Sequence, residues 1–239
     1  STFVQNLNAL IKPTSGVVRV DGEDINRDKI TRRDIKRRIG LVFQYPEYQL
    51  FEETVAEDIA FGPKNMKLPQ EEIDERVHEA AGFVGVEEAL FSSSPLELSG
   101  GQKRRVAIAG VIAMRPEVLI LDEPTAGLDP AGSRQIMDNI QAYREKTGST
   151  VMIVSHDMDA AAKYCDRIIV FEHGSVRMDG TPEEIFTRSG ELTEIGLDVP
   201  KPTELADALR RQGIALEGPI FTHAQLLEAL RKEGEVPAS

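Results

Sequence analysis

The sequence predicts an α/β protein with a mainly parallel sheet, an inserted helical subdomain and a small C-terminal extension. Short apolar strands alternate with helices, which is typical of parallel strands covered on both faces. A run with helical periodicity, from about residue 55 to residue 115, interrupts that alternation. After residue 196 two amphipathic helices follow. We therefore expect an α/β domain over residues 1–196 and an extension over residues 197–239.

The individual elements follow from the spacing of apolar residues and from turn-forming residues. Strands are expected where short apolar runs end in polar or turn residues, at 17–22, 39–44, 118–124 and 150–157. Helices are expected where apolar residues recur at helical spacing, at 2–11, 31–38 and 130–148, besides the inserted run. Pro13 and Gly16 mark the end of the first helix. Residues 166–180 predict a hairpin that turns at His173 and Gly174.

The charge balance limits the classes of ligand. The chain carries 28 basic and 40 acidic residues, for a formal net charge of −12. Broad nucleic-acid binding requires a basic face, so we expect no nucleic-acid partner. A nucleotide ligand remains compatible with this charge, because backbone N–H groups, a Mg²⁺ ion and a few local cations suffice for a phosphate site.

Two acidic residues, Asp122 and Glu123, directly follow the apolar run VLIL. Ligands of open α/β sheets bind beyond the carboxyl ends of the strands. Adjacent carboxylates at that place repel each other unless a ligand uses them. They suit phosphoryl transfer, with Asp122 supporting Mg²⁺ and Glu123 polarising a water. The alternative is a pair of capping or surface acids.

His156 ends the next apolar strand. Because parallel strands bring their carboxyl ends together, we expect His156 to face the same site as Glu123. There it would contact a terminal phosphate and hold the attacking water. The alternative is a strand-end histidine with satisfied hydrogen bonds.

The segment LSGGQKRRVAIAG (98–110) predicts an anion site at the start of a helix. Ser99, Gly100 and Gly101 precede the helical run, where free N–H groups and the positive end of the helix dipole attract anions. The alternative is an ordinary serine N-cap, which needs no glycine pair. We interpret three basic residues as solvated side chains: Lys103, Arg104 and Arg105.

Two further polar residues stand where the chain leaves an expected element. Gln44 closes the strand IGLVFQ and is a candidate ligand for Mg²⁺ or water on a flexible loop. Asp129 precedes Pro130 and the following helix. The alternatives are a polar residue that closes a strand and a helix N-cap with proline at the first position.

In this order, Gln44, LSGGQ, LILDEPTAGLDP and VSHD resemble the ATP-binding cassette family of ATPases. The resemblance implies a core of the P-loop nucleoside-triphosphatase type, with ATP and Mg²⁺ as cofactors. It implies that two cassettes pair head to tail and enclose ATP between them. Asp122 and Gln44 would then hold Mg²⁺, Glu123 would be the general base and His156 the sensor. Other residues implied to contact nucleotide are Ser99, Gly100, Gly101, Gln102 and Asp129.

The first residues, STFVQNLNALIKPTSG, resemble the continuation of the phosphate-binding loop G-x-x-x-x-G-K-[ST] in this family. Ser1 then corresponds to the hydroxyl that ligates Mg²⁺, and Thr2 to its phosphate-contacting neighbour. The glycines and lysine of the motif do not precede Ser1 in this chain. We therefore expect an N-terminal truncation within this loop, and weak ATP binding and no activity for the chain as given.

The segments FQYPEYQLFEETVAEDIAFGPKNM (43–66) and LSGGQKRRVAIAGVIAM resemble the ATPases of energy-coupling factor transporters, in particular the second of their two paralogous subunits. This implies an ATPase peripheral on the cytoplasmic face of the cell membrane, driving uptake of a vitamin or transition-metal ion. The implied partners are a second ATPase subunit in a heterodimer, a transmembrane coupling subunit and a substrate-binding membrane subunit.

The segment after Gln44 is acidic, and a basic coupling helix is its expected partner. Its acids are Glu47, Glu52, Glu53, Glu57 and Asp58. A solvated face is the alternative. For the whole protein, the competing function is a soluble cassette ATPase without a role in transport.

Overall fold

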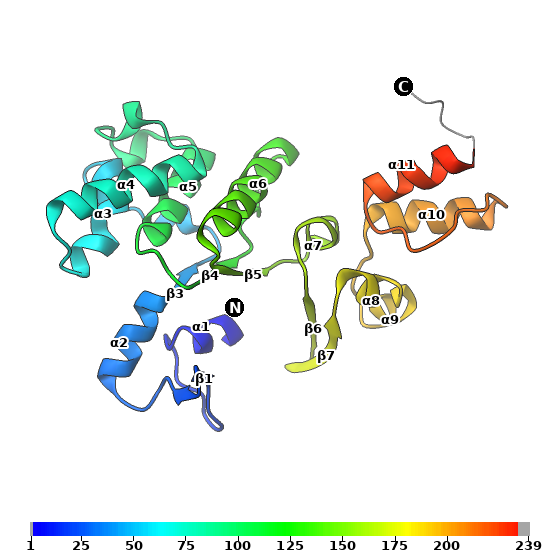
Figure 1. The fold of residues 1–239 in the computed structure, drawn as a ribbon, viewed down its shortest axis with the longest axis horizontal. Helices are drawn as coiled ribbons and strands as arrows, with labels where there is room; N and C mark the ends of the chain where they lie inside the picture. Colours follow the sequence, from blue (N-terminus) through cyan, green and yellow to red (C-terminus); the bar gives the residue numbers. More distant parts are fainter. Residues whose placement is uncertain (1, 234–239) are drawn as a thin grey trace. The chain divides into compact units, whose positions relative to one another are not determined.

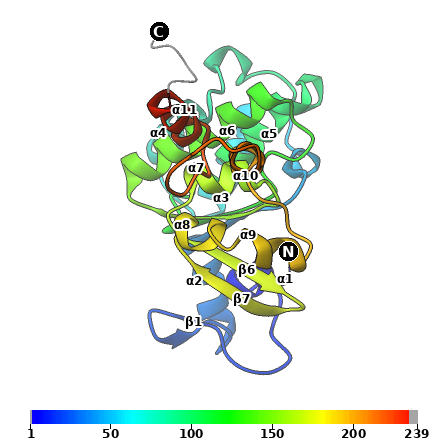
Figure 2. The same cartoon turned by 90° about the vertical axis from the view of Figure 1, so that its right-hand side faces the viewer.

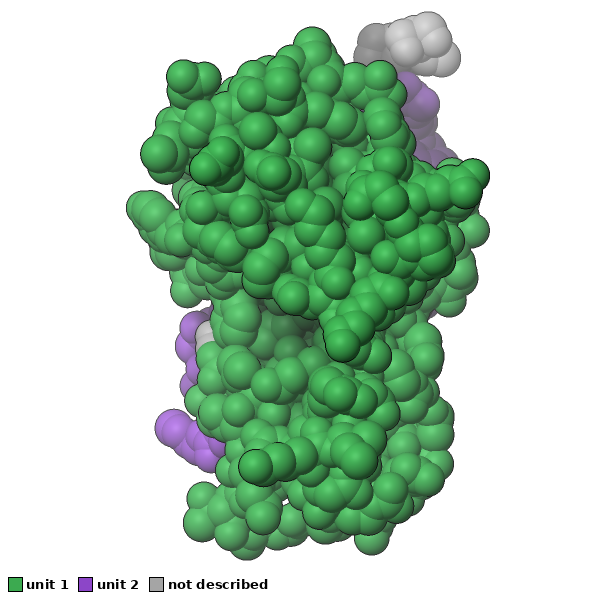
Figure 3. Space-filling view, turned by 90° about the vertical axis from the view of Figure 1, so that its left-hand side faces the viewer, with its two compact units in different colours: residues 1–154 green, residues 155–239 purple. Residues whose placement is uncertain are grey.

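A computed structural model describes residues 2–233, and the chain divides into two compact units. The first unit is residues 1–154 and the second is residues 155–239, coloured green and purple in Figure 3. The predicted boundary near residue 196 lies within the second unit and stays a prediction.

A parallel sheet of three strands, in the order β3-β4-β5, forms the centre of the first unit. Its strands are β3 (Ile39–Val42), β4 (Val118–Asp122) and β5 (Thr150–Val154). The central strand β4 is fully buried over residues 119–121, as expected for a strand with neighbours on both sides and helices around it. The predicted parallel sheet is therefore confirmed.

Helices surround this sheet (Figure 1). They are α1 (Thr2–Leu7), α2 (Lys29–Arg38), α3 (Val55–Asn65), α4 (Gln70–Val84), α5 (Gly100–Ile112) and α6 (Pro130–Thr147). Short 3₁₀ turns are η1 (Pro46–Gln49), η2 (Glu88–Leu90) and η3 (Pro95–Glu97), and a small hairpin joins β1 (Arg19–Val20) to β2 (Glu23–Asp24). Helices α3, α4 and α5 pack against one another, as the inserted helical run predicts. Helix α5 also contacts β3, and α4 contacts α6.

The first helix is shorter than predicted. The sequence predicts a helix over residues 2–11, but α1 ends at Leu7. The side-chain oxygen of Asn8 accepts a hydrogen bond from the backbone N–H of Leu10, at 3.2 Å. This local turn competes with the helical hydrogen bonds, and Ala9 adopts a left-handed backbone with φ of 55°.

The second unit contains an antiparallel hairpin, visible in Figure 2, of β6 (Ile168–Glu172) and β7 (Ser175–Gly180). His173 and Gly174, which join the strands, both have positive φ, so the predicted turn is confirmed. The helices of this unit are α7 (Met158–Tyr164), α8 (Pro182–Phe186), α9 (Ser189–Glu194), α10 (Lys201–Arg211) and α11 (His223–Lys232). The last two are the predicted amphipathic pair, whereas the sequence analysis did not predict α7, α8 and α9.

Candidate functional site

The end of β4 brings the two predicted acidic residues to the carboxyl edge of the sheet. Asp122 is the last residue of β4 and is only 3% exposed. Glu123 follows with a left-handed backbone, φ of 51°, and its N–H donates to the carbonyl oxygen of Val154 at 2.9 Å. Such a backbone is uncommon for a residue with a side chain and is frequent at functional sites. The chain therefore makes a tight turn at the residue predicted to be the general base.

Gln44 lies at the same edge of the sheet. Val42, the last residue of β3, pairs with Leu121 of β4, so both strands end side by side. Gln44 comes two residues after β3 and is exposed, just before η1. The structure thus brings Gln44, Asp122 and Glu123 to one edge, as the parallel arrangement predicts.

Helix α5 begins at the predicted anion site. Ser99 and Gln102 form a reciprocal capping box: the Ser99 hydroxyl accepts from the Gln102 N–H, and the Gln102 side-chain oxygen accepts from the Ser99 N–H at 2.9 Å. The N-cap alternative for Ser99 is therefore observed. A Cβ atom added at Gly100 or Gly101 would meet no atom within 4 Å. Packing within this chain therefore does not require glycine at either position.

Four further residues were predicted to contact the nucleotide, its Mg²⁺ ion or the attacking water. Asp129 caps α6, since its side-chain oxygen accepts from the Gly132 N–H at 2.9 Å. Thr2 is exposed at the start of α1, whereas Ser1 lies outside the described residues. His156 is exposed in the second unit, just before α7. The nucleotide roles of these four residues stay predictions.

The predicted metal ligands have the chemistry that suits Mg²⁺. Mg²⁺ takes oxygen ligands, commonly one or two carboxylates, with substrate phosphates and water completing its shell. Asp122 offers a buried carboxylate and Gln44 an amide oxygen at the same edge of the sheet. Within residues 2–233, no group of three or more histidine, cysteine, aspartate and glutamate side chains is arranged to hold a metal. The donors fit an ion that a nucleotide helps to bind.

The interpretation of Arg104 as a solvated side chain is wrong. Arg104 is 2% exposed and pairs with Glu47, with 2.9 Å between Nη2 and Oε1. Spacing would have indicated this burial, because Arg104, Ile108 and Ile112 stand at i, i+4 and i+8 on one buried face of α5. The pairing could not be predicted, since Glu47 is 57 residues away in the sequence.

Three of the five acids predicted to face a basic partner bond within the chain: Glu47, Asp58 and Glu57, which accepts from the Thr54 hydroxyl at 3.0 Å. Glu47 pairs with Arg104, and Asp58 is buried at 8% exposure. Asp58 accepts a hydrogen bond from the N–H of Phe51 at 3.2 Å. Burial raises the pKa of the Asp58 carboxyl above its ordinary value, although backbone N–H groups of the same loop oppose the rise.

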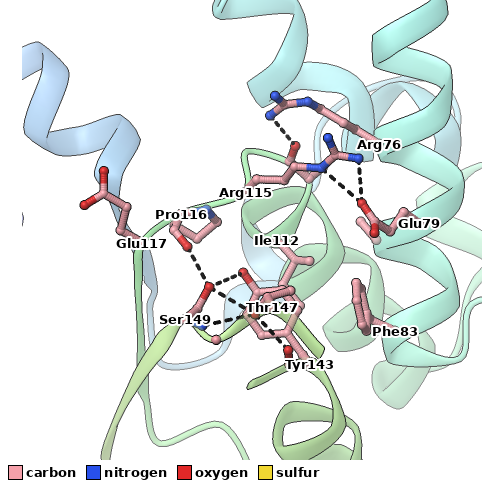
Figure 4. Close-up of a pocket in the computed structure, with 13 residues that line it drawn as sticks. Arg76, Glu79, Phe83, Ile112, Arg115, Pro116, Glu117, Tyr143, Thr147 and Ser149 are labelled. Atoms are coloured by element: carbon pink, nitrogen blue, oxygen red, sulfur yellow. Dashed lines mark hydrogen bonds and ion pairs between the residues drawn. The ribbon is translucent and has the colours of Figure 1, made fainter. Parts of the chain in front are cut away.

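A pocket of about 420 Å³ lies at the opposite edge of the sheet (Figure 4). Residues from α4 and α6 line it, together with the chain just before β4 and β5, such as Pro116 and Ser149. The hydroxyl of Ser149 donates to the carbonyl oxygen of Pro116 at 3.1 Å. None of the predicted site residues lines this pocket.

Comparison with known proteins identifies the class of protein to which this chain belongs. The family described as ABC transporter matches residues 1–126. The solved structure of cbiO1 from Clostridium perfringens, part of the ABC transporter complex cbiONQ, superposes with a TM-score of 0.74 and 40% identity, covering 87% of this chain and 82% of that one. The ATP-binding cassette MJ0796, bound to ADP and Pi, has a TM-score of 0.67 and 32% identity, over 76% of this chain and 79% of that one. The chain belongs to the ABC transporter family.

Curated relatives show which ABC transporter proteins this chain resembles. The energy-coupling factor transporter ATP-binding protein EcfA2 of Caldanaerobacter subterraneus is 51% identical over 222 residues, which are 93% of this chain and 78% of the relative. The protein of the same name from Clostridium perfringens is 51% identical over 231 residues, 96% of this chain and 81% of the relative. The predicted fold class and the predicted resemblance to energy-coupling factor ATPases are confirmed.

Proposed function

We propose that this chain is the ATP-hydrolysing subunit of an energy-coupling factor importer, which couples ATP hydrolysis to uptake of a vitamin or a transition-metal ion. One observation carries the proposal. In a chain about half identical to ATP-binding proteins of such transporters, Gln44, Asp122 and Glu123 share the carboxyl edge of the parallel sheet. That edge is where α/β proteins act on their ligands.

The predicted site residues are assigned the following roles in hydrolysis. Glu123 is the general base that orients and deprotonates the attacking water, and His156 senses the terminal phosphate. Ser1, Gln44 and Asp122 hold Mg²⁺, which neutralises charge on the phosphates when bound. Thr2 is proposed to contact the phosphates, and Asp129 to contact the nucleotide.

The open start of α5 serves the nucleotide of a second cassette. Gly100 and Gly101 present backbone N–H groups at the positive end of a 13-residue helix, and Ser99 and Gln102, whose own N–H groups form the capping box, hold that end in place. The empty space over both glycines supports this role, because an anion can approach the backbone closely there. A paralogous ATPase subunit that completes a heterodimer is the proposed partner.

A membrane subunit docks on exposed aromatic side chains that follow Gln44. This aromatic segment consists of Tyr45, Tyr48, Phe51 and Phe61. Tyr48 is 85% exposed, and the rings of Phe51 and Phe61 meet edge to face, with centroids 4.8 Å apart. Exposed apolar groups that cluster in this way are typical of protein interfaces. The exposed acid Glu53 next to them favours a basic coupling helix as the occupant.

These interactions make the protein a peripheral subunit on the cytoplasmic face of the cell membrane. No helix within residues 2–233 combines the length and the apolar character needed to cross a membrane. Attachment to the membrane is therefore proposed to run through the transmembrane coupling subunit, which also contacts the substrate-binding subunit.

Affinity purification of the intact protein from detergent-solubilised membranes tests the proposal. We expect a transmembrane subunit and a second ATPase to co-purify, and the complex to release phosphate from ATP. Glu53→Lys combined with Tyr48→Ala, on the proposed docking surface, is expected to lose the transmembrane subunit. Co-sedimentation with ribosomes and no membrane partner would instead support the soluble cassette ATPase.

A further inference from the structure

One buried guanidinium joins three separate segments of the first unit. Arg104 donates from Nε and Nη2 to the two carboxylate oxygens of Glu47, at 3.2 and 2.9 Å. Its Nη1 donates to the carbonyl oxygens of Pro124, at 3.4 Å, and of Ala126. Charged side chains are rarely this buried unless they are paired, and Arg104 is paired through Nε, Nη1 and Nη2.

The three segments are the ones that carry the proposed chemistry. Glu47 lies in η1, three residues after Gln44. Arg104 lies in the first turns of α5, whose start is the proposed contact to the second cassette's ATP. Pro124 and Ala126 follow Glu123 directly. A single side chain thus connects the loop of Gln44, helix α5 (named the signature helix because it begins within LSGGQ) and the turn of the general base.

The geometry of arginine suits this connection. A guanidinium presents five N–H donors in a rigid plane, and it can serve both oxygens of one carboxylate and further acceptors at once. A lysine offers a point charge without that fixed fork. The turn that Arg104 supports is the left-handed one at Glu123. Two backbone bonds also hold this turn, from the Glu123 N–H to the Val154 carbonyl and from the Ala126 N–H to the Glu123 carbonyl.

We propose that Arg104 is a positioning residue for ATP hydrolysis, resting on the function proposed above. Through Glu47 and the two carbonyl groups it fixes the Glu123 turn relative to the Gln44 loop and the signature helix. Tyr45 and Tyr48 of the aromatic segment flank Glu47 in the sequence. A membrane subunit that docks on this segment can therefore shift Glu47, and through Arg104 the general base Glu123. Misplacement of a catalytic group by about 1 Å costs on the order of 100-fold in rate, so this link governs turnover.

The chain offers a matched control at the other end of α5. Arg76 of α4 also binds one glutamate and two carbonyl oxygens. It donates to Glu72 at 3.0 and 2.7 Å and to the carbonyls of Ala113 and Met114 at 3.4 and 3.2 Å. Its side chain is also largely buried, at 12% exposure. No predicted site residue belongs to this cluster, so its loss affects packing alone.

The test compares Arg104→Gln with Arg76→Gln in the intact protein, purified with its membrane subunits. For Arg104→Gln we expect kcat to fall about tenfold or more, while KM for ATP changes less than about threefold. Arg76→Gln is expected to keep kcat within about twofold. Both variants are expected to lower the midpoint of thermal unfolding, because each breaks a buried network.

Glu47→Gln is a second, milder variant that keeps the shape of the side chain and leaves both carbonyl contacts of Arg104 intact. It is expected to lower kcat by the same mechanism, by less than Arg104→Gln. Arg104→Lys is expected to leave kcat low, since lysine lacks the fork. A wild-type kcat in Arg104→Gln or Glu47→Gln, or equal losses of kcat in Arg104→Gln and Arg76→Gln, would overturn the positioning role alone. A wild-type complex that hydrolyses no ATP would overturn the proposed function as well.

Discussion

The carboxyl and amino edges of the three-stranded sheet differ in how their polar groups are paired. At the carboxyl edge, Glu123 has a left-handed backbone and Gln44 is exposed. At the amino edge, the polar groups around the pocket of Figure 4 bond within the chain, for example Arg115 to Glu79 at 2.7 Å. Arg115 at the amino edge has the same left-handed φ of 51° as Glu123, so backbone strain does not distinguish the two edges. They differ in that these polar groups of the amino edge pair within the chain, whereas Gln44 is exposed where ligands are proposed to bind. We therefore expect substitutions at the amino edge to lower the free energy of unfolding, and substitutions at the carboxyl edge to lower kcat.

The largest effect on stability is expected at the amino edge. Tyr143 is 2% exposed, and its ring meets Phe83 edge to face, with centroids 5.1 Å apart. Tyr143→Ala is expected to lower the free energy of unfolding by about 3–5 kcal/mol, because a large cavity opens. Urea denaturation of the intact protein measures this change, and kcat of the folded protein should stay near the wild-type value.

Tyr143→Phe is the control, since it keeps the ring and removes only the hydroxyl that contacts Ser149 at 3.4 Å. Its cost is expected to stay below about 1 kcal/mol. A Tyr143→Ala protein with normal stability and a lowered kcat would contradict the claim that the amino edge serves stability and not catalysis.

A smaller effect is expected where β3 packs against α5. A Cβ atom at Gly40 would lie 2.6 Å from Cγ1 of Val111, so Gly40→Ala forces the helix away from the strand. We expect a loss of about 1–3 kcal/mol in the free energy of unfolding. Gly82→Ala in α4 is the matched control. A Cβ atom there meets nothing within 4 Å, and the change should stabilise the helix by about 0.5–1 kcal/mol. Equal stabilities of the two variants would contradict the described packing.

The parallel sheet could be predicted from the sequence, whereas the pairing of Arg104 with Glu47 beside the candidate site could not. Buried apolar runs such as 118–121 indicate parallel strands by composition alone. Helix α7 was missed, although Asp157 caps it by accepting from the Ala160 N–H and is a recognisable start signal. The catalytic candidate Glu123 was predicted from its place directly after a buried strand and from the family resemblance. The pairing of Arg104 could not be predicted, because Glu47 is 57 residues away and only the folded chain brings the two side chains together.

The contribution of Asp58 to stability should depend on pH. Burial raises the folded-state pKa of Asp58 above the unfolded value of 3.8. The folded protein then binds this proton more tightly, so the contribution of Asp58 to stability declines as pH rises from about 4 through the raised pKa. Asp58→Asn should remove this decline. Unfolding midpoints recorded from pH 4 to pH 8 measure it, and parallel curves for wild type and variant would refute it.

The smallest effect is expected for Glu117, at the amino edge. Hydrogen bonds from Arg38, at 2.8 and 2.7 Å, lower the pKa of the Glu117 carboxyl below its ordinary value of 4.5. This contribution to stability is present above pH 4.5 and is lost as pH falls through the lowered pKa. Because Glu117 is 60% exposed, Glu117→Gln should cost less than about 1 kcal/mol at pH 7 and nothing at low pH. A cost that is independent of pH would exclude the ion pair as its cause.

The chemistry assigned to the carboxyl edge is tested most directly by single-turnover phosphate release from ATP bound to the intact protein in its membrane complex. With Glu123→Gln, ATP binding should persist while phosphate release slows by about 100-fold or more, since the general base is lost. An unchanged rate of phosphate release would contradict both the role of Glu123 and the assignment of hydrolysis to this edge of the sheet.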